Sequence, residues 1–206
     1  MFLFSPLGCP FGYRESFFGI PPFCLDSALS WQFELINAFL PSVGGNLSFA
    51  DFHHLLFPHP TDQADYQYPE DGLLQAFGVV PDAELRNPQH LDVHGDKCML
   101  VVKNGSATGT TVGRANGLES FKRTYEEHGI VTQTSIEIAV LPYDNKHGKF
   151  SDRGDSGSVV LARDGRIFGI LTGGAGSTDE IDITFVTPYW WIEEQIKAKY
   201  PGACLY

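Results

Sequence analysis

The residues best suited to chemistry lie in the segment Gly154-Asp155-Ser156-Gly157-Ser158, which leads into an apolar stretch. A serine hydroxyl is a poor nucleophile unless a base takes its proton and hydrogen-bond donors hold the oxyanion that develops. Glycine on both sides of the serine lets the chain turn tightly and present backbone N–H groups. The segment therefore predicts Ser156 as a nucleophile, with the N–H groups of Gly154 and Ser156 converging on one oxyanion. The competing interpretation is a surface turn between two strands.

The elements that must position this segment are short strands. From Lys97 onward, apolar segments alternate with glycine or polar turns, and Asp164-Gly165 is typical of a hairpin turn. We expect six strands, over residues 98–103, 111–116, 134–142, 157–162, 166–172 and 182–187. The pattern predicts an all-β fold in which one small antiparallel barrel closes on itself.

A helix is expected to follow the last strand, over residues 188–199. Proline suits a first helical turn, acidic residues suit the N-terminal end and basic residues suit the C-terminal end, because of the helix macrodipole. The sequence offers these in order: Pro188, then Glu193 and Glu194, then Lys197 and Lys199. We therefore expect a C-terminal helix packed against the barrel.

Several of these pieces resemble chymotrypsin-like (trypsin-like) serine proteases, with bacterial and fungal members the most similar. Residues 154–158 resemble the nucleophile region, 102–113 the strand-turn-strand that opens the second barrel, and 169–174 the strand that lines the substrate cleft. Phe185-Val186-Thr187-Pro188, leading into Trp191-Ile192, resembles the last strand and the C-terminal helix. The resemblance covers residues 97–200. It implies a chymotrypsin-like second barrel and an endopeptidase that needs no cofactor and acts on peptides or proteins.

The resemblance assigns roles to further residues. Thr172, Gly173 and Gly174 would dock the substrate, and Phe150 would lie near the base of the specificity pocket, where a phenyl ring argues against a basic substrate side chain. Asp155 would form a buried ion pair that shapes the oxyanion loop, although the sequence does not identify its cation.

The family uses a His, Asp, Ser triad in that chain order. Cys24-Leu25-Asp26-Ser27-Ala28-Leu29 resembles the family's Asp-x-Ala-Leu stretch and makes Asp26 the candidate that orients the base. An ordinary cap or turn residue is the equally weighted alternative for Asp26.

The histidine of the triad is not at its expected place. The family carries it some tens of residues before the aspartate, yet none of the 25 residues before Asp26 is a histidine. Either most of the first barrel is absent from the chain, or His53 or His54 is the base, with Asp62 or Asp65 as its partner. Removal of one triad member leaves only about 10³–10⁴-fold catalysis over water. We therefore expect an inactive protease homologue, with a non-catalytic module that binds peptides by strand addition as the alternative.

The chain divides into two parts on this interpretation. Residues 1–91 are expected to be an incomplete or divergent remnant of the first barrel plus a linker over 57–72, and residues 92–206 form the barrel with the serine. Residues 26–40 do not distinguish a helix from a strand by their periodicity. An incomplete first barrel would expose an apolar patch, so a partner that covers it is also expected.

Composition excludes some classes of function. Fourteen basic against 25 acidic residues give a net charge of −11, which disfavours binding to nucleic acids or to an anionic membrane surface. No apolar run is long enough to span a bilayer, and residues 1–10 do not resemble a signal peptide. The protein is therefore expected to be intracellular, or to be secreted with its true N-terminus further upstream.

For two other sets of residues we expect no special chemistry. Asp51, His53, His54 and His59 lack the spacing of a zinc site, so we expect no metal. The four cysteines, Cys9, Cys24, Cys98 and Cys204, contain no C-x-x-C pair and allow three pairings, so reduced thiols are the simplest expectation.

Overall fold

The computed structural model describes residues 5–6, 46–62, 76–125, 131–175 and 182–205. The expectations for residues 26–40 and for Asp26, Asp65, Cys9 and Cys24 concern residues outside these ranges. The strands and helices, in chain order, are β1 (Ser5–Pro6), α2 (Phe49–Leu56), α3 (Asp82–Arg86), β2 (His90–Leu91), β3 (Lys97–Gly105), β4 (Gly109–Tyr125), β5 (Val131–Pro142), β6 (Val159–Ala162), β7 (Ile167–Ala175), β8 (Ile183–Pro188), α4 (Tyr189–Lys199) and β9 (Ala203–Cys204).

Six of the strands form a closed antiparallel barrel. They are hydrogen-bonded in the order β3-β4-β5-β8-β7-β6, and β6 pairs again with β3 to complete the circle. Each of the six predicted strands is present, and the turn at Asp164-Gly165 joins β6 to β7 with Gly165 at a φ of 87°. The all-β class, the closed barrel and the C-terminal helix are thereby confirmed. That a first barrel is truncated stays a prediction, as does the division at residue 91.

Strand β3 has buried side chains on both of its faces. Alternate residues of a strand point to opposite sides, and here Met99 and Val101 join one apolar cluster while Leu100 and Val102 join the other. The first cluster also contains Ile138, Val140, Phe168 and Val186 from strands around the barrel. The second contains side chains from α2 and Tyr189 at the start of α4. Burial on both faces explains why residues 98–102 read as an unbroken apolar run.

Helix α2 covers part of the barrel wall. Ser48 caps its N-terminus by accepting a hydrogen bond from the Asp51 N–H (3.2 Å), and Phe52, Leu55 and Leu56 are buried in the second cluster. This helix and α3, which contributes Leu85 to the first cluster, both come from the part of the chain before residue 92. The described residues of that part therefore share their apolar core with the barrel.

Helix α4 begins at Tyr189, one residue after the predicted start, and this is too early to place Glu193 in its first turn. Pro188 is its N-cap and Lys197 and Lys199 lie in its last turn, as expected, but its first turn contains no acidic residue. Glu193 lies one turn further along and pairs with Lys197 (2.6 Å) across one helical turn. The expected acidic start is therefore wrong, because the helix opens with the aromatic residues that pack on the barrel.

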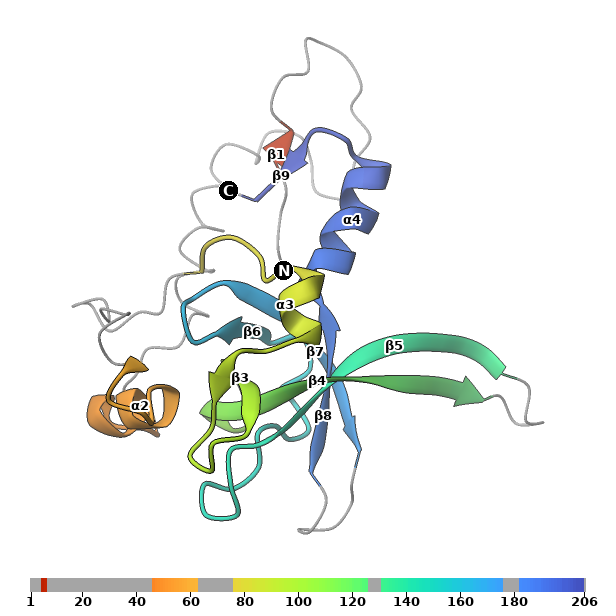
Figure 1. The fold of residues 1–206 in the computed structure, drawn as a ribbon. Helices are drawn as coiled ribbons and strands as arrows, with labels where there is room; N and C mark the ends of the chain where they lie inside the picture. Colours follow the sequence, from red (N-terminus) through yellow and green to blue (C-terminus); the bar gives the residue numbers. More distant parts are fainter. Residues whose placement is uncertain (1–4, 7–45, 63–75, 126–130, 176–181, 206) are drawn as a thin grey trace.

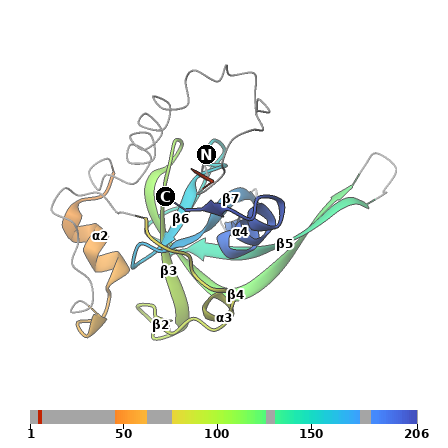
Figure 2. The same ribbon diagram turned by 90° about the horizontal axis from the view of Figure 1, so that it is seen from above.

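Strands β4 and β5 continue beyond the barrel as a two-stranded ribbon, which Figure 1 shows extending away from the other strands. The same ribbon leads away from α4 in the view from above (Figure 2). A register shift in the β4–β5 pair, between Ala115 and Glu119, separates the barrel part of the two strands from the ribbon. On the ribbon, Phe121 faces Ile136, and these side chains are 67% and 50% exposed. No described helix is long and apolar enough to cross a membrane.

Candidate functional site

Ser156 lies in the loop between β5 and β6 and is exposed to solvent. The glycines around it hold backbone conformations that other residues rarely adopt, with φ of 108° at Gly154 and 89° at Gly157. Gly154 and Ser156 donate no backbone hydrogen bond to any described residue. Both N–H groups therefore have no backbone partner among the described residues, and their role as an oxyanion site stays a prediction.

The serine loop is joined to strand β7. Gly157 N–H donates to the carbonyl of Leu171 (2.8 Å), and Leu171 N–H donates back to the carbonyl of Ser158 (3.0 Å). These two bonds continue the pairing of β6 with β7, which ends at Ile170. Ser156 is consequently held where the residues expected to dock a substrate, 172–174, begin.

Beyond Leu171, strand β7 has one free edge among the described residues. Its other edge pairs with β8, in which Phe185 faces Gly173 and Thr184 faces Gly174. Thr172 Oγ1 donates to the Phe185 carbonyl (3.3 Å), and a register shift lies between Leu171 and Gly173. A short stretch of unpaired, glycine-rich strand edge therefore adjoins the serine loop.

Asp155 precedes the serine in the chain, and its carboxylate has no exposed surface. Its Oδ1 accepts hydrogen bonds from the N–H groups of Ala107 (2.8 Å) and Thr108 (3.2 Å). Its Oδ2 accepts from the hydroxyl of Thr108 (2.7 Å) and from the N–H of Asp152 (3.1 Å). Most of these donors belong to the turn between β3 and β4, so this carboxylate joins the serine loop to a distant hairpin.

Lys103 is the cation that the sequence did not identify. Its Nζ lies 3.1 Å from Asp155 Oδ2, and both side chains are fully buried. The ammonium also donates to Thr108 Oγ1 and to the Gly109 carbonyl (3.1 Å). Lys103 follows Met99 and Val101 along β3 in steps of two residues, and alternation places its side chain on the same face as theirs. The expected buried ion pair is therefore present, with Lys103 as its positive partner.

Burial and hydrogen bonding act in opposite directions on this pair. Burial alone would raise the pKa of Asp155, but the hydrogen bonds from Thr108, Asp152 and Ala107 and the bond from Lys103 outweigh it and hold the pKa of Asp155 well below its usual range. Burial lowers the pKa of Lys103, and the hydrogen bond and charge of Asp155 oppose that effect. The carboxylate is therefore ionised at neutral pH.

The hairpin that holds Asp155 admits no larger residue at Gly105. A Cβ there would lie 2.2 Å from Asp155 Oδ1, far inside van der Waals contact. Next along the chain, Ser106 Oγ donates to the Gly154 carbonyl (2.7 Å). Asn46 supports the hairpin from the other side, since its Nδ2 donates to the Thr110 carbonyl (2.7 Å) and its Oδ1 accepts from the Thr110 N–H (2.9 Å). The loop and hairpin thus form one connected hydrogen-bond network.

Phe150 lies in the barrel core. Its ring has no exposed surface, belongs to the first apolar cluster and has Lys103 Nζ 5.8 Å from its centroid. Its backbone is fixed as well, because its N–H donates to Asp182 (2.9 Å) and its carbonyl accepts from Thr111 Oγ1 (2.6 Å). A side chain without exposed surface cannot touch a substrate in this conformation. The ring of Phe150 therefore packs in the barrel, and its place near the base of a specificity pocket stays a prediction.

No described histidine forms a hydrogen bond with Ser156. His53 lies on α2 with its ring between those of Phe49 and Phe57, at centroid distances of 6.3 and 5.1 Å. Asp62, one of the two candidates to orient a base, instead pairs with Arg163 (2.9 Å). His128 and Asp26 lie outside the described residues. Among the described residues, Ser156 therefore has no histidine bonded to it that could act as its base, and its role as a nucleophile stays a prediction.

The histidines near α2 form no group with other potential metal ligands among the described residues. His59 Nε2 lies 2.9 Å from the Asp92 carbonyl, and no three His, Cys, Asp or Glu side chains of the described residues gather in one group. Cys98 is buried and forms no disulfide, and Cys204 is half-buried.

The comparisons with known proteins come from solved structures alone. No family model matches the chain, and no curated protein matches it. A chymotrypsin from Cellulomonas bogoriensis is 20% identical with a TM-score of 0.39, over 65% of this chain and 55% of its own. A glutamic acid-specific serine protease described as using a histidine triad in substrate binding is 17% identical with a TM-score of 0.39, over 64% and 55%. A protease from M. tuberculosis in its active form is 15% identical with a TM-score of 0.37, over 64% and 50%.

These matches span only about half the length of each solved chain. Their low scores assign no residue a role here, so the roles of Ser156, Asp155 and Lys103 depend on the geometry described above.

Proposed function

We propose that the chain is a homologue of trypsin-like serine endopeptidases that binds an extended peptide beside Ser156 but does not cleave it at a useful rate. The observation that supports this most is the buried Lys103–Asp155 pair, which fixes the loop of an exposed serine. A simple surface turn between strands has no need of a fully buried ion pair in its support.

Binding and cleavage make different demands on the site. Binding by strand addition needs an unpaired strand edge, and residues 172–174 of β7 offer one next to the serine loop. Cleavage needs in addition a base within hydrogen-bond reach of Ser156 Oγ, and no described histidine bonds to it. The peptide-binding half of the function is therefore better supported than the hydrolytic half.

Intact-mass detection of a fluorophosphonate adduct tests the catalytic half. The chain, its Ser156→Ala variant and its Ser158→Ala variant are incubated with the probe after circular dichroism has shown that all three are folded. We expect no stoichiometric adduct on any of them, because an unassisted serine reacts too slowly.

A stoichiometric adduct that Ser156→Ala abolishes and Ser158→Ala retains would overturn this expectation. It would mean that Ser156 is activated by a base, and cleavage of a peptide substrate would then have to be measured. His53 and His54 would then be the first side chains to replace.

A further inference from the structure

Strand addition at β7 would place one side chain of the bound peptide against a particular spot on the barrel. In an antiparallel pair, residues directly opposite each other project to the same face of the sheet, with Cβ atoms about 4.5–5.5 Å apart. Gly173 has no side chain, so the residue opposite it would meet whatever lies beyond the missing Cβ of Gly173.

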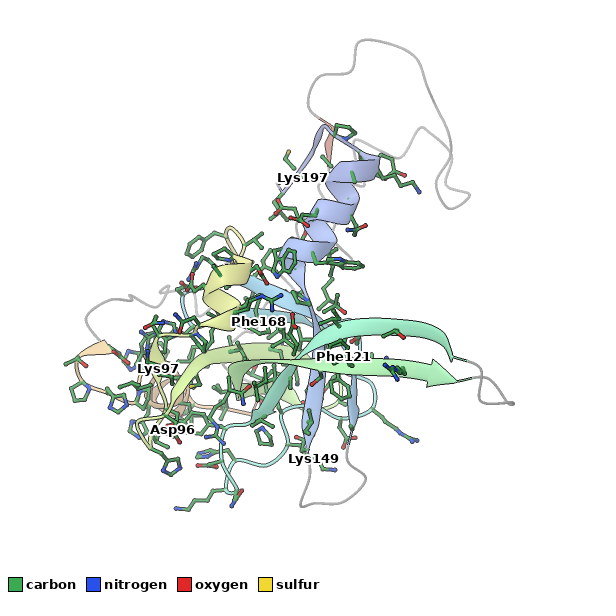
Figure 3. All side chains as sticks on the ribbon, turned by 45° about the vertical axis from the view of Figure 1, so that its right-hand side comes forward. Asp96, Lys97, Phe121, Lys149, Phe168 and Lys197 are labelled. Atoms are coloured by element: carbon green, nitrogen blue, oxygen red, sulfur yellow. The ribbon has the colours of Figure 1, made fainter. Side chains whose placement is uncertain are left out.

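What lies there is the ammonium group of Lys122. A Cβ built on Gly173 would be 3.8 Å from Lys122 Nζ, an ordinary contact distance. Lys122 comes from the β4–β5 ribbon, where it faces Ser135. Phe121, its neighbour, projects to the other face of the ribbon and is labelled in Figure 3. The ammonium group of Lys122, from the ribbon, thus lies beside the unpaired edge of β7.

The charge of Lys122 is not used by the described residues. Lys122 forms no ion pair with any of them, whereas the nearby carboxylates are engaged: Glu119 with Arg86 (2.7 Å), and Glu137 with the hydroxyl of Thr187 (2.6 Å).

We propose that Lys122 makes the site selective for extended peptides with an acidic side chain at the position opposite Gly173. This inference depends on the peptide-binding function proposed above and names the class of peptide. A glutamate there would bring its carboxylate to the ammonium, while a lysine there would be repelled. The contact is open to solvent, so its contribution is that of an exposed ion pair, and increased salt weakens it.

Chemical-shift titration of the ¹⁵N-labelled chain tests the proposal. Three blocked pentapeptides are compared, alanine on both sides of a central Glu, Gln or Lys. We expect all three to perturb the amides of residues 172–174, with Glu bound about twofold to fivefold more tightly than Gln and Lys more weakly than either. Lys122→Ala should reduce the Glu-to-Gln ratio to about one, and Lys122→Glu should reverse the order.

Arg123→Ala is the matched control. It changes the net charge by the same amount as Lys122→Ala, from the next position of the same strand, but on the opposite face of the ribbon. The Glu preference should persist in this variant. If Arg123→Ala abolishes the preference too, the effect is one of net charge and the proposal is wrong.

Two failures can be told apart. Equal binding of the Glu and Gln peptides, with residues 172–174 perturbed, would overturn the role of Lys122 and leave peptide binding intact. No perturbation of these amides by any peptide at millimolar concentration would overturn both the proposed function and this inference.

Discussion

Two aspartates among the described residues are almost completely buried, Asp155 next to the serine and Asp92 before β3, and both meet a cation and backbone N–H groups. The N–H groups that Asp92 binds lie two and four residues further along its own turn, at His94 and Asp96. Three of the hydrogen bonds to Asp155 come from residues 47 or 48 positions away. The same chemistry thus fixes a local turn in one place and joins distant segments in the other.

The cations of the two pairs differ as well. Arg114 lies 2.6 Å from Asp92 but keeps 26% of its side chain exposed, whereas Lys103 has no exposed surface. A partly exposed cation is screened by water, and water can replace it when it is removed. A fully buried one cannot be replaced, so the serine loop depends on its ion pair far more than the turn at Asp92 does.

The largest expected effect follows from removal of each cation in turn. Lys103→Met leaves a buried carboxylate without its counter-charge and should lower the free energy of unfolding by about 3–5 kcal/mol. Arg114→Met should cost about 1–2 kcal/mol, since water reaches that site. Urea unfolding of both variants measures the two losses. Equal losses would contradict the contrast between the two pairs.

Acid should weaken the protein through both aspartates. The pKa of Asp155 and that of Asp92 are lowered by hydrogen bonds and charges that outweigh burial, so the unfolded chain takes up protons before the folded one. Their stabilisation is fully present above an unfolded-state pKa of about 4 and is lost as pH falls through the folded-state values.

For one such carboxylate the loss is of the order of 2–3 kcal/mol. Urea unfolding between pH 2 and pH 7 should show a plateau above pH 5 and a fall below pH 4. Asp92→Asn should retain most of that fall, because Asp155 still titrates. If the free energy of unfolding of Asp92→Asn does not change with pH, Asp92 alone causes the acid sensitivity and Asp155 does not contribute to it.

The smallest effect is expected at the serine itself. Ser156 is exposed and its hydroxyl bonds to no described residue, so Ser156→Ala should change the free energy of unfolding by less than about 0.5 kcal/mol. Thermal unfolding compared with the unmodified chain measures it. A clear loss of stability would mean that the hydroxyl, and not only its loop, belongs to the supporting network.

The barrel was predictable because its signals are local. Alternating apolar residues and glycine turns marked all six strands, and β3 read as an apolar run because both of its faces are buried. The same alternation carried an unused signal, since it places Lys103 on a buried face together with Val101. A lysine on such a face requires a carboxylate, and that requirement would have pointed to Asp155.

Other parts of the site were less predictable, because they depend on distances across the fold. Phe150 was placed by counting back from Ser156, and no local pattern shows that its ring turns into the barrel. Nothing in the sequence around Lys122 indicates its contact with Gly173, because that contact depends on where the ribbon lies relative to β7. Contacts of this kind arise only after several strands have paired.

The hydrogen bonds of Asp155 also bear on the order of events during folding. These bonds join residues about 50 positions apart, one just before β6 and the others just after β3. The pairing of β6 with β3 is the one that closes the barrel. Contacts at such sequence separation carry a high entropic cost of loop closure and form only when the intervening chain has been ordered. The serine loop should therefore take its final conformation among the last steps of folding, so that order at Ser156 reports a barrel that has already closed.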